Sequence, residues 1–135
     1  MVVVGPSGTD RVAAVYGQPV EWWCRYDVAE GGITYWEQVA SSRSAEVVLV
    51  LQREGGRVLL HTKGYYPQGA YRLLTGGVHP GEDLQAAVER EGAEETGLHL
   101  AVQRYLALIH NAFVADGRRA MLDSHVLLVT AEDGT

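Results

Sequence analysis

Cysteine is almost absent from this sequence, since Cys24 is the only one among 135 residues. A single cysteine cannot close a disulfide within the chain, so a fold held by disulfides is excluded. Cys24 stands in an apolar, aromatic run, where a small buried residue in a reducing cytoplasm is the ordinary interpretation. The five histidines show no metal-ligand spacing, and with one cysteine they do not predict a zinc site.

A long hydrophobic run and an excess of positive charge are also missing. No stretch approaches the roughly 18 apolar residues of a membrane span, and the N-terminal Met-Val-Val-Val is too short for a signal peptide. We therefore expect a cytoplasmic protein without a membrane partner. The net charge of −6 argues against a nucleic-acid polymer as partner, because its backbone requires a positive groove. A small phosphate-bearing ligand is compatible, since a bound cation can balance its charge.

The hydrophobic residues, 47% of the chain, are enough for one ordinary globular core. Their periodicity predicts strands, then one helix, then more strands. The expected strands cover 46–51, 58–62, 71–75, 98–110 and 121–130, and the expected helix covers 82–96, with Gly97 as its stop. This order predicts the α+β class with a mixed sheet.

The N-terminal part of the sequence predicts a β-hairpin over residues 20–39. Apolar or aromatic residues alternate from Val20 to Val28, Glu30-Gly31-Gly32 predicts a turn, and an extended pattern resumes at 33–39. We assign residues 1–42 to an N-terminal extension and 43–135 to the main domain. A lone hairpin is marginally stable, so this one is expected either to form a homodimer interface or to cover its own core.

Three acidic side chains gather on one side of the predicted helix. At about 100° per residue, Glu91, Glu94 and Glu95 fall within roughly a 100° arc of the helix surface. They repel one another, and the dipole of the last helical turn disfavours negative charge. A site for a hard divalent cation explains the cluster, because Mg²⁺ takes oxygen ligands from carboxylates, phosphates and water. From charge alone, a solvated acidic helix face is the more common explanation.

A glycine-rich loop leads into this helix and completes a recognisable spacing. The order is Gly76, five residues, Glu82, seven residues, Arg90-Glu91, two residues, Glu94-Glu95, one residue, Gly97 and then Leu98. It resembles the Nudix box at every fixed position. Seven prescribed residues at fixed spacing would occur by chance in about one chain of this size in 10⁵ to 10⁶.

The resemblance implies both a fold and a metal site. In the Nudix family the box forms a loop–helix–loop packed on a mixed sheet, within an α/β/α sandwich. By the same resemblance, Mg²⁺ or Mn²⁺ would be held by the three helix glutamates and the backbone carbonyl of the first glycine, and a loop–helix ion pair would stabilise the box. The metal ligands are then Glu91, Glu94, Glu95 and Gly76, and the pair is Glu82 and Arg90.

The implied reaction is hydrolysis of a phosphoanhydride bond by a metal-activated water. The expected substrate is a nucleoside diphosphate linked to another moiety: a nucleotide sugar, an ADP-ribose-like compound or a nucleoside triphosphate. Glu94 is one candidate for the general base, and a residue of a later loop is the other. Lys63 and Arg72 flank the glycine loop and are candidates to meet a substrate phosphate, although solvated side chains are the ordinary explanation. The alternative function is a non-catalytic Nudix-like nucleotide-binding or sensor module.

Two features depart from the family pattern. Gly92 stands where an aliphatic residue is usual and faces the core, so we expect a bulky neighbour there, one of the three tryptophans. Only 37 residues follow Leu98, so the domain is expected to be short at its C-terminus.

Asp123-Ser124-His125 contains the residue types of a catalytic triad, but on a strand Ser124 points opposite to its neighbours, and we expect no triad.

Overall fold

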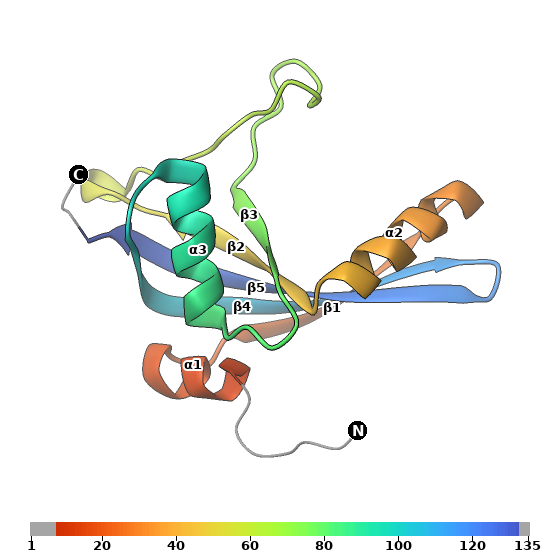
Figure 1. Ribbon diagram of the computed structural model, residues 1–135, viewed down its shortest axis with the longest axis horizontal. Coiled ribbons are helices and arrows are strands. Elements are labelled where there is room, and N and C mark those ends of the chain that lie inside the picture. Colours follow the sequence, from red (N-terminus) through yellow and green to blue (C-terminus); the bar gives the residue numbers. More distant parts are fainter. Residues whose placement is uncertain (1–7, 133–135) are drawn as a thin grey trace.

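The computed structural model describes residues 8–132, and Figure 1 shows how its elements are arranged. In chain order they are α1 (Gly8–Tyr16), β1 (Val20–Asp27), α2 (Glu30–Ser42), β2 (Ala45–Leu51), the short 3₁₀ helix η1 (Glu54–Gly56), β3 (Leu74–Val78), α3 (Leu84–Thr96), β4 (Leu100–Ala115) and β5 (Arg118–Ala131). None of the described helices has the length and apolar character needed to cross a bilayer.

The five strands form one mixed sheet in the order β1-β4-β5-β2-β3. Strands β4 and β5 are antiparallel, and the turn between them places Asp116 and Gly117 at φ 45° and 77°. Such a turn with two positive φ values matches the right-handed twist of a hairpin. Strand β1 runs parallel to β4, β2 runs parallel to β5, and β3 is antiparallel to β2. The predicted α+β class with a mixed sheet is confirmed.

The main core lies between the sheet and helices α1 and α3, which lie near each other in Figure 1. Strand β2 alternates buried and half-buried residues, as expected of a strand that presents one face to a core. Leu127 and Val129 of β5 belong to this core, whereas Ala120 and Leu122 of the same strand pack with α2. The first pair has odd residue numbers and the second pair has even ones, and successive side chains of a strand point to opposite faces. Helices α2 and α3 therefore contact opposite faces of β5.

The second strand of the predicted N-terminal hairpin is wrong, because residues 30–42 form helix α2. The side of α2 that faces the sheet carries Ile33, Trp36, Val39 and Ala40, which have the spacing of a helix. Over a segment this short, such a spacing is easily mistaken for the alternation of a strand. The contact that decides the matter is distant in sequence: the Trp36 ring stacks on Phe113 with centroids 3.8 Å apart. The first strand is correct, but it pairs with β4.

One further prediction needs correction. Residues 58–62 make only the isolated bridges Gln52–Val58 and His61–Arg72 instead of a strand, and the aliphatic side chains of 58–60 are exposed, with no core to hold them. The N-terminal extension also contributes to the main domain, since Val12 of α1 lies in the core and β1 joins the sheet. The boundary proposed at residue 42 stays a prediction.

The neighbour of Gly92 is Leu100, not a tryptophan. A Cβ atom on Gly92 would lie 2.8 Å from both Cγ and Cδ1 of Leu100, closer than real Cβ contacts come. The glycine in the middle of α3 is therefore explained by the close approach of the first residue of β4. This packing replaces the bulky aliphatic side chain that the family pattern has on the helix.

Gly92→Ala is expected to destabilise the protein despite the better helix propensity of alanine. The propensity gain is about 1 kcal/mol, whereas overpacking a core costs about 1–3 kcal/mol. In a Leu100→Ala background the clash is removed, and the same substitution is expected to stabilise by up to about 1 kcal/mol. Denaturant unfolding of the four proteins measures this coupling. Equal effects of Gly92→Ala in both backgrounds would contradict it.

Candidate active site

The glycine-rich segment lies on β3, at the edge of the sheet. Gly76 pairs with Val47 and Gly77 with Glu46 of β2, so the backbone of the glycine pair is fixed by the sheet. The loop that follows leads into α3, which begins after the N-cap Asp83 and ends at Gly97 in the left-handed conformation (φ 73°). The predicted end of this helix is confirmed, and its start lies two residues later than predicted, at Leu84 instead of Glu82.

Arg90 connects the loop, the strand and the helix. Its Nε and Nη2 donate to the two carboxylate oxygens of Glu82, each at 2.9 Å. The Nη2 group also donates to the carbonyl oxygen of Gly77 at 2.6 Å, and Nη1 donates to Glu91 at 2.7 Å. The backbone N–H of His79 donates to Glu82 at 3.1 Å and closes the loop. The planar fork of arginine suits such a bidentate contact, which a lysine could not reproduce.

The charge on Glu82 is held firmly by this geometry. The hydrogen bonds from Arg90 lower the pKa of Glu82 to about 2, even though partial burial acts in the opposite direction. The same contacts raise the pKa of Arg90 above its ordinary value. Glu82 is therefore ionised and paired at neutral pH, which suits a positioning residue and does not suit a general base.

Gly76 makes room for the carboxylate of Glu91. A Cβ atom on Gly76 would lie 2.0 Å from Cδ and 2.2 Å from Cγ of Glu91, so no other residue fits without moving that side chain. Glu91 is only 7% exposed, yet it carries a carboxylate. Burial of a charge requires partners, and here Arg90 supplies one of them. Gly76 and Glu91 are therefore packed directly against each other.

Glu94 and Glu95 lie on the exposed side of α3. Glu94 lies 3.6 Å from Nη1 of Arg90 and its side chain is 58% exposed, and Glu95 is also exposed. In the range 8–132, no three acidic, histidine or cysteine side chains converge into a metal-binding group. The available donors, carboxylates and a backbone carbonyl, are all oxygen atoms and suit a hard divalent cation by their chemistry.

The sequence comparison decides the family. The family model described as the NUDIX domain matches residues 42–135. The chain belongs to the NUDIX family. Members of this family generally use divalent metal ions, and the residues that the box places together in the structure are Gly76, Gly77, Glu82, Arg90 and Glu91.

Individual relatives match over shorter segments. The mitochondrial NAD(P)H pyrophosphatase NUDT13 of Mus musculus is 37% identical over 81 residues, which is 60% of this chain and 22% of that protein. The NAD-capped RNA hydrolase NudC of Chromobacterium violaceum is 38% identical over 68 residues, 50% of this chain and 26% of that protein. The human NAD-capped RNA hydrolase NUDT12 is 33% identical over 61 residues, 45% of this chain and 13% of that protein. The chain therefore spans about a quarter or less of the length of these relatives.

Lys63 and Arg72, the predicted phosphate contacts, lie in the long segment before the Nudix box. Arg72 lies over the ring of Tyr66, 5.3 Å from its centroid, and its backbone pairs with His61. Among the side chains that the structure describes, neither basic residue makes an ion pair with the group around Arg90. Their role toward a substrate stays a prediction.

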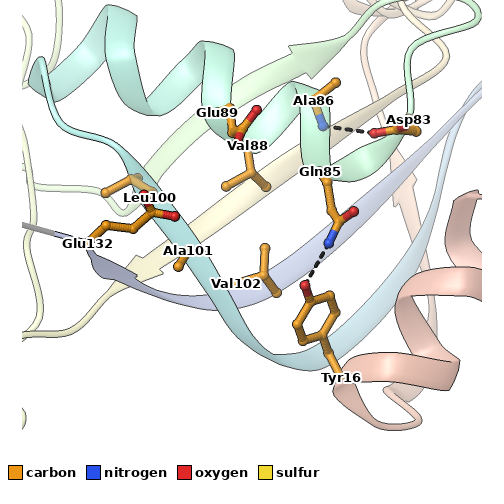
Figure 2. A pocket seen from close by; sticks show the side chains of 10 residues that line it. All are labelled: Tyr16, Asp83, Gln85, Ala86, Val88, Glu89, Leu100, Ala101, Val102 and Glu132. Atoms are coloured by element: carbon orange, nitrogen blue, oxygen red, sulfur yellow. Dashed lines mark hydrogen bonds between the residues drawn. The ribbon is translucent and has the colours of Figure 1, made fainter.

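A hollow on the other side of α3 contains none of the predicted site residues of the Nudix box. It measures about 390 Å³ and lies between α1, α3 and β4. Figure 2 shows Gln85, which donates a hydrogen bond of 2.6 Å to the Tyr16 hydroxyl, and Glu89 farther along the helix. Because Glu89 lines this hollow, it offers a matched acidic control for the box glutamates.

The expectation that Asp123-Ser124-His125 forms no triad agrees with the contacts of Ser124. Its hydroxyl donates to Glu46 at 2.7 Å and accepts from Asn111 at 2.9 Å, on the face opposite to its two neighbours. The other face of β5 carries a feature that the sequence pattern does not reveal. Asp123 and His125 share it and line a cavity beside the Nudix loop. The alternation of side chains along β5 predicts that Asp123 and His125 share a face. The cavity itself is formed by the packing of the Nudix loop against that face.

Proposed function

We propose that this chain is a Mg²⁺- or Mn²⁺-dependent pyrophosphohydrolase acting on a nucleoside diphosphate linked to a second moiety. The observation that carries the proposal is the Gly76–Glu91–Arg90–Glu82 arrangement, in which each of these four residues contacts another of them. The family match and the names of the relatives support the same reaction type.

The names of the relatives also suggest which substrate to test first. One is named an NAD(P)H pyrophosphatase and two are named NAD-capped RNA hydrolases. The compounds in these names share a pyrophosphate between two nucleoside units, so we propose a dinucleotide of this kind as the first candidate. The net charge of −6 favours the small molecule over the RNA polymer as the partner of this chain.

In the proposed mechanism a bound divalent ion supplies charge neutralisation and an activated water. The chain contributes the geometry. Glu91 is held against the β3 backbone by Gly76 and oriented by Arg90, while Glu94 and Glu95 offer exposed carboxylates on the next turn. Glu94, whose side chain is 58% exposed, would be one candidate to accept a proton from the attacking water, and a residue of a later loop would be the other. Glu82 keeps Arg90 in place.

Two further proposals concern the setting of the enzyme. A cytoplasmic location stays a proposal, and one of the relatives is named as mitochondrial. A homodimer also stays a proposal, now without the hairpin as its basis. Its remaining support is β1, an edge strand of the described sheet, on which Trp22 and Trp23 are 61% and 73% exposed.

Chelation is the direct test of the proposed function. Turnover of NAD⁺, ADP-ribose, nucleotide sugars and nucleoside triphosphates is measured by chromatography of the products. With EDTA we expect no turnover of any substrate, and addition of Mg²⁺ or Mn²⁺ is expected to restore it. Unchanged turnover after exhaustive chelation would refute the metal-dependent hydrolase. Tight nucleotide binding without any product would instead favour the non-catalytic sensor module.

A further inference from the structure

A cavity of about 470 Å³ lies between the Nudix loop and the face of strands β4 and β5. Its apolar wall consists of Ala45, Val78, Leu84 and Leu108, and its polar groups include Asp123 and His125. The volume falls in the range of small-molecule pockets, which are mostly apolar with a few placed polar groups. The cavity is next to the Nudix box, since Glu82 also lines it, but it contains none of Glu91, Glu94 and Glu95.

His125 is one of the polar residues that line this cavity. The residue is only 4% exposed, and its Nδ1 lies 2.6 Å from the hydroxyl of Tyr105. Burial lowers the pKa of His125 to about 4 and raises the pKa of Tyr105, so the ring is neutral and the hydroxyl keeps its proton at neutral pH. In the tautomer in which the tyrosine hydroxyl donates to Nδ1, the imidazole proton resides on Nε2. No described residue makes a hydrogen bond to Nε2.

Asp123 offers a hydrogen-bond acceptor on the same face, two residues before His125 on β5. Its Oδ1 accepts from Nδ1 of His110 at 2.8 Å. Its Oδ2 has no hydrogen-bond partner among residues 8–132, and the side chain is 41% exposed. Nε2 of His110 is held by Glu21 at 3.2 Å, which fixes the imidazole and, through it, the orientation of the Asp123 carboxylate.

The charges around the cavity favour a neutral ligand group. Of the three carboxylates that line it, Glu82 is paired with Arg90, Asp123 contacts His110, and Asp83 accepts from the backbone N–H of Ala86 at the start of α3. A phosphate would meet these carboxylates at close range and be repelled. No carboxylate is left without a partner, so a free cation is not required either.

We propose that this cavity binds a base ring that carries an amino donor beside a hydrogen-bond acceptor. Asp123 Oδ2 would accept from the amino group and His125 Nε2 would donate to the acceptor, while the apolar wall contacts the ring. Adenine presents this pattern through its amidine edge, and the uncharged dihydronicotinamide ring presents it through its carboxamide. The inference rests on the proposed function, because it assigns one end of a nucleotide-type substrate to this cavity.

The test measures binding without metal. Adenosine and reduced nicotinamide riboside are titrated into the protein in EDTA by calorimetry. Purine riboside, which lacks the amino group, and reduced nicotinic acid riboside, which replaces the amide with a carboxylate, are titrated beside them. At least one amino-bearing ligand is expected to bind about tenfold or more tightly than its counterpart, and the preferred pair identifies the ring. Equal affinities within both pairs, or no binding by any of the four nucleosides, would overturn the proposal.

Two matched variants locate the ligand. In Asp123→Asn, the amide oxygen keeps the hydrogen bond with His110, so the NH₂ group faces the cavity. This NH₂ group would oppose the amino group of the ligand, and two donors cannot form a hydrogen bond. Affinity is therefore expected to fall at least tenfold. Glu89→Gln also removes one negative charge but lies in the hollow between α1 and α3 and does not line this cavity, so affinity should be unchanged. His125→Phe removes the second hydrogen bond while keeping a ring. Equal affinities in Asp123→Asn and wild type, with normal melting curves, would refute the site.

Failure of this inference and failure of the proposed function are distinguishable. If ligands bind as expected in EDTA but no substrate is hydrolysed with metal, the cavity stands and the hydrolase does not. If hydrolysis is metal-dependent but Asp123→Asn leaves both nucleoside binding and KM unchanged, the hydrolase stands and the cavity does not.

Discussion

Glu95→Gln is expected to reduce hydrolysis by at least roughly 100-fold while leaving the folded structure intact. A misplaced metal ion loses both the activation of water and the stabilisation of charge on the phosphates. The glutamate is exposed, and glutamine keeps its shape, so the substitution removes little besides one negative charge. Stability without metal should be unchanged or higher by a few tenths of a kcal/mol, because repulsion with Glu91 at i,i+4 is relieved. Turnover at saturating Mg²⁺ measures the first effect and denaturant unfolding the second.

Glu89→Gln is the matched control, since it removes the same charge from the same helix. Glu89 lines the hollow of Figure 2, away from β3, so activity should stay within about twofold of wild type. Mg²⁺ should also raise the melting temperature of wild type and of Glu89→Gln more than that of Glu95→Gln, because a ligand stabilises only what it binds. Equal hydrolysis rates for wild type and Glu95→Gln would show that the acids are only a solvated helix face.

The local parts of this fold could be predicted from the sequence because their determinants are local. Helix α3 ends where predicted, at a glycine in the left-handed conformation, and the residue that caps its start lies within the predicted segment. The spacing of the Nudix box likewise encodes contacts over a few residues, such as Arg90 with Glu91 and Glu82. Such patterns remain visible in the sequence whatever the rest of the chain does.

The parts that could not be predicted depend on distant partners. Residues 30–42 are a helix because Ile33 and Trp36 pack on an apolar surface of β4 and β5. The sequence of this segment does not indicate that Phe113 will be its partner. The same holds for Gly92, whose reason is the side chain of Leu100. It holds for the cavity at Asp123 and His125 as well, which exists only where the Nudix loop crosses the sheet.

Gly76→Ala is expected to abolish most of the activity, with hydrolysis falling at least roughly 100-fold. The new methyl group would occupy the position where Cδ of Glu91 lies, 2.0 Å from the ideal Cβ, so the carboxylate must move away from the β3 backbone. Its displacement breaks the contact with Arg90 and removes a proposed metal ligand from its place. Overpacking should also destabilise the fold by about 1–3 kcal/mol. Metal-dependent turnover and unfolding are measured on the same preparation.

Gly77→Ala separates the effect of Glu91 from a general intolerance of β3 to side chains. The three heavy atoms nearest to a Cβ atom on Gly77 all belong to the side chain of Arg43, at 3.1–3.3 Å, and that long side chain can shift. Activity should therefore fall by less than about tenfold, with a stability change within about 1 kcal/mol. A second comparison, Gly76→Ala with Glu91→Ala, relieves the clash and should recover stability relative to Gly76→Ala alone without recovering activity. If neither stability nor activity recovers, the glycine is needed for the backbone of β3 and not to make room for the Glu91 carboxylate.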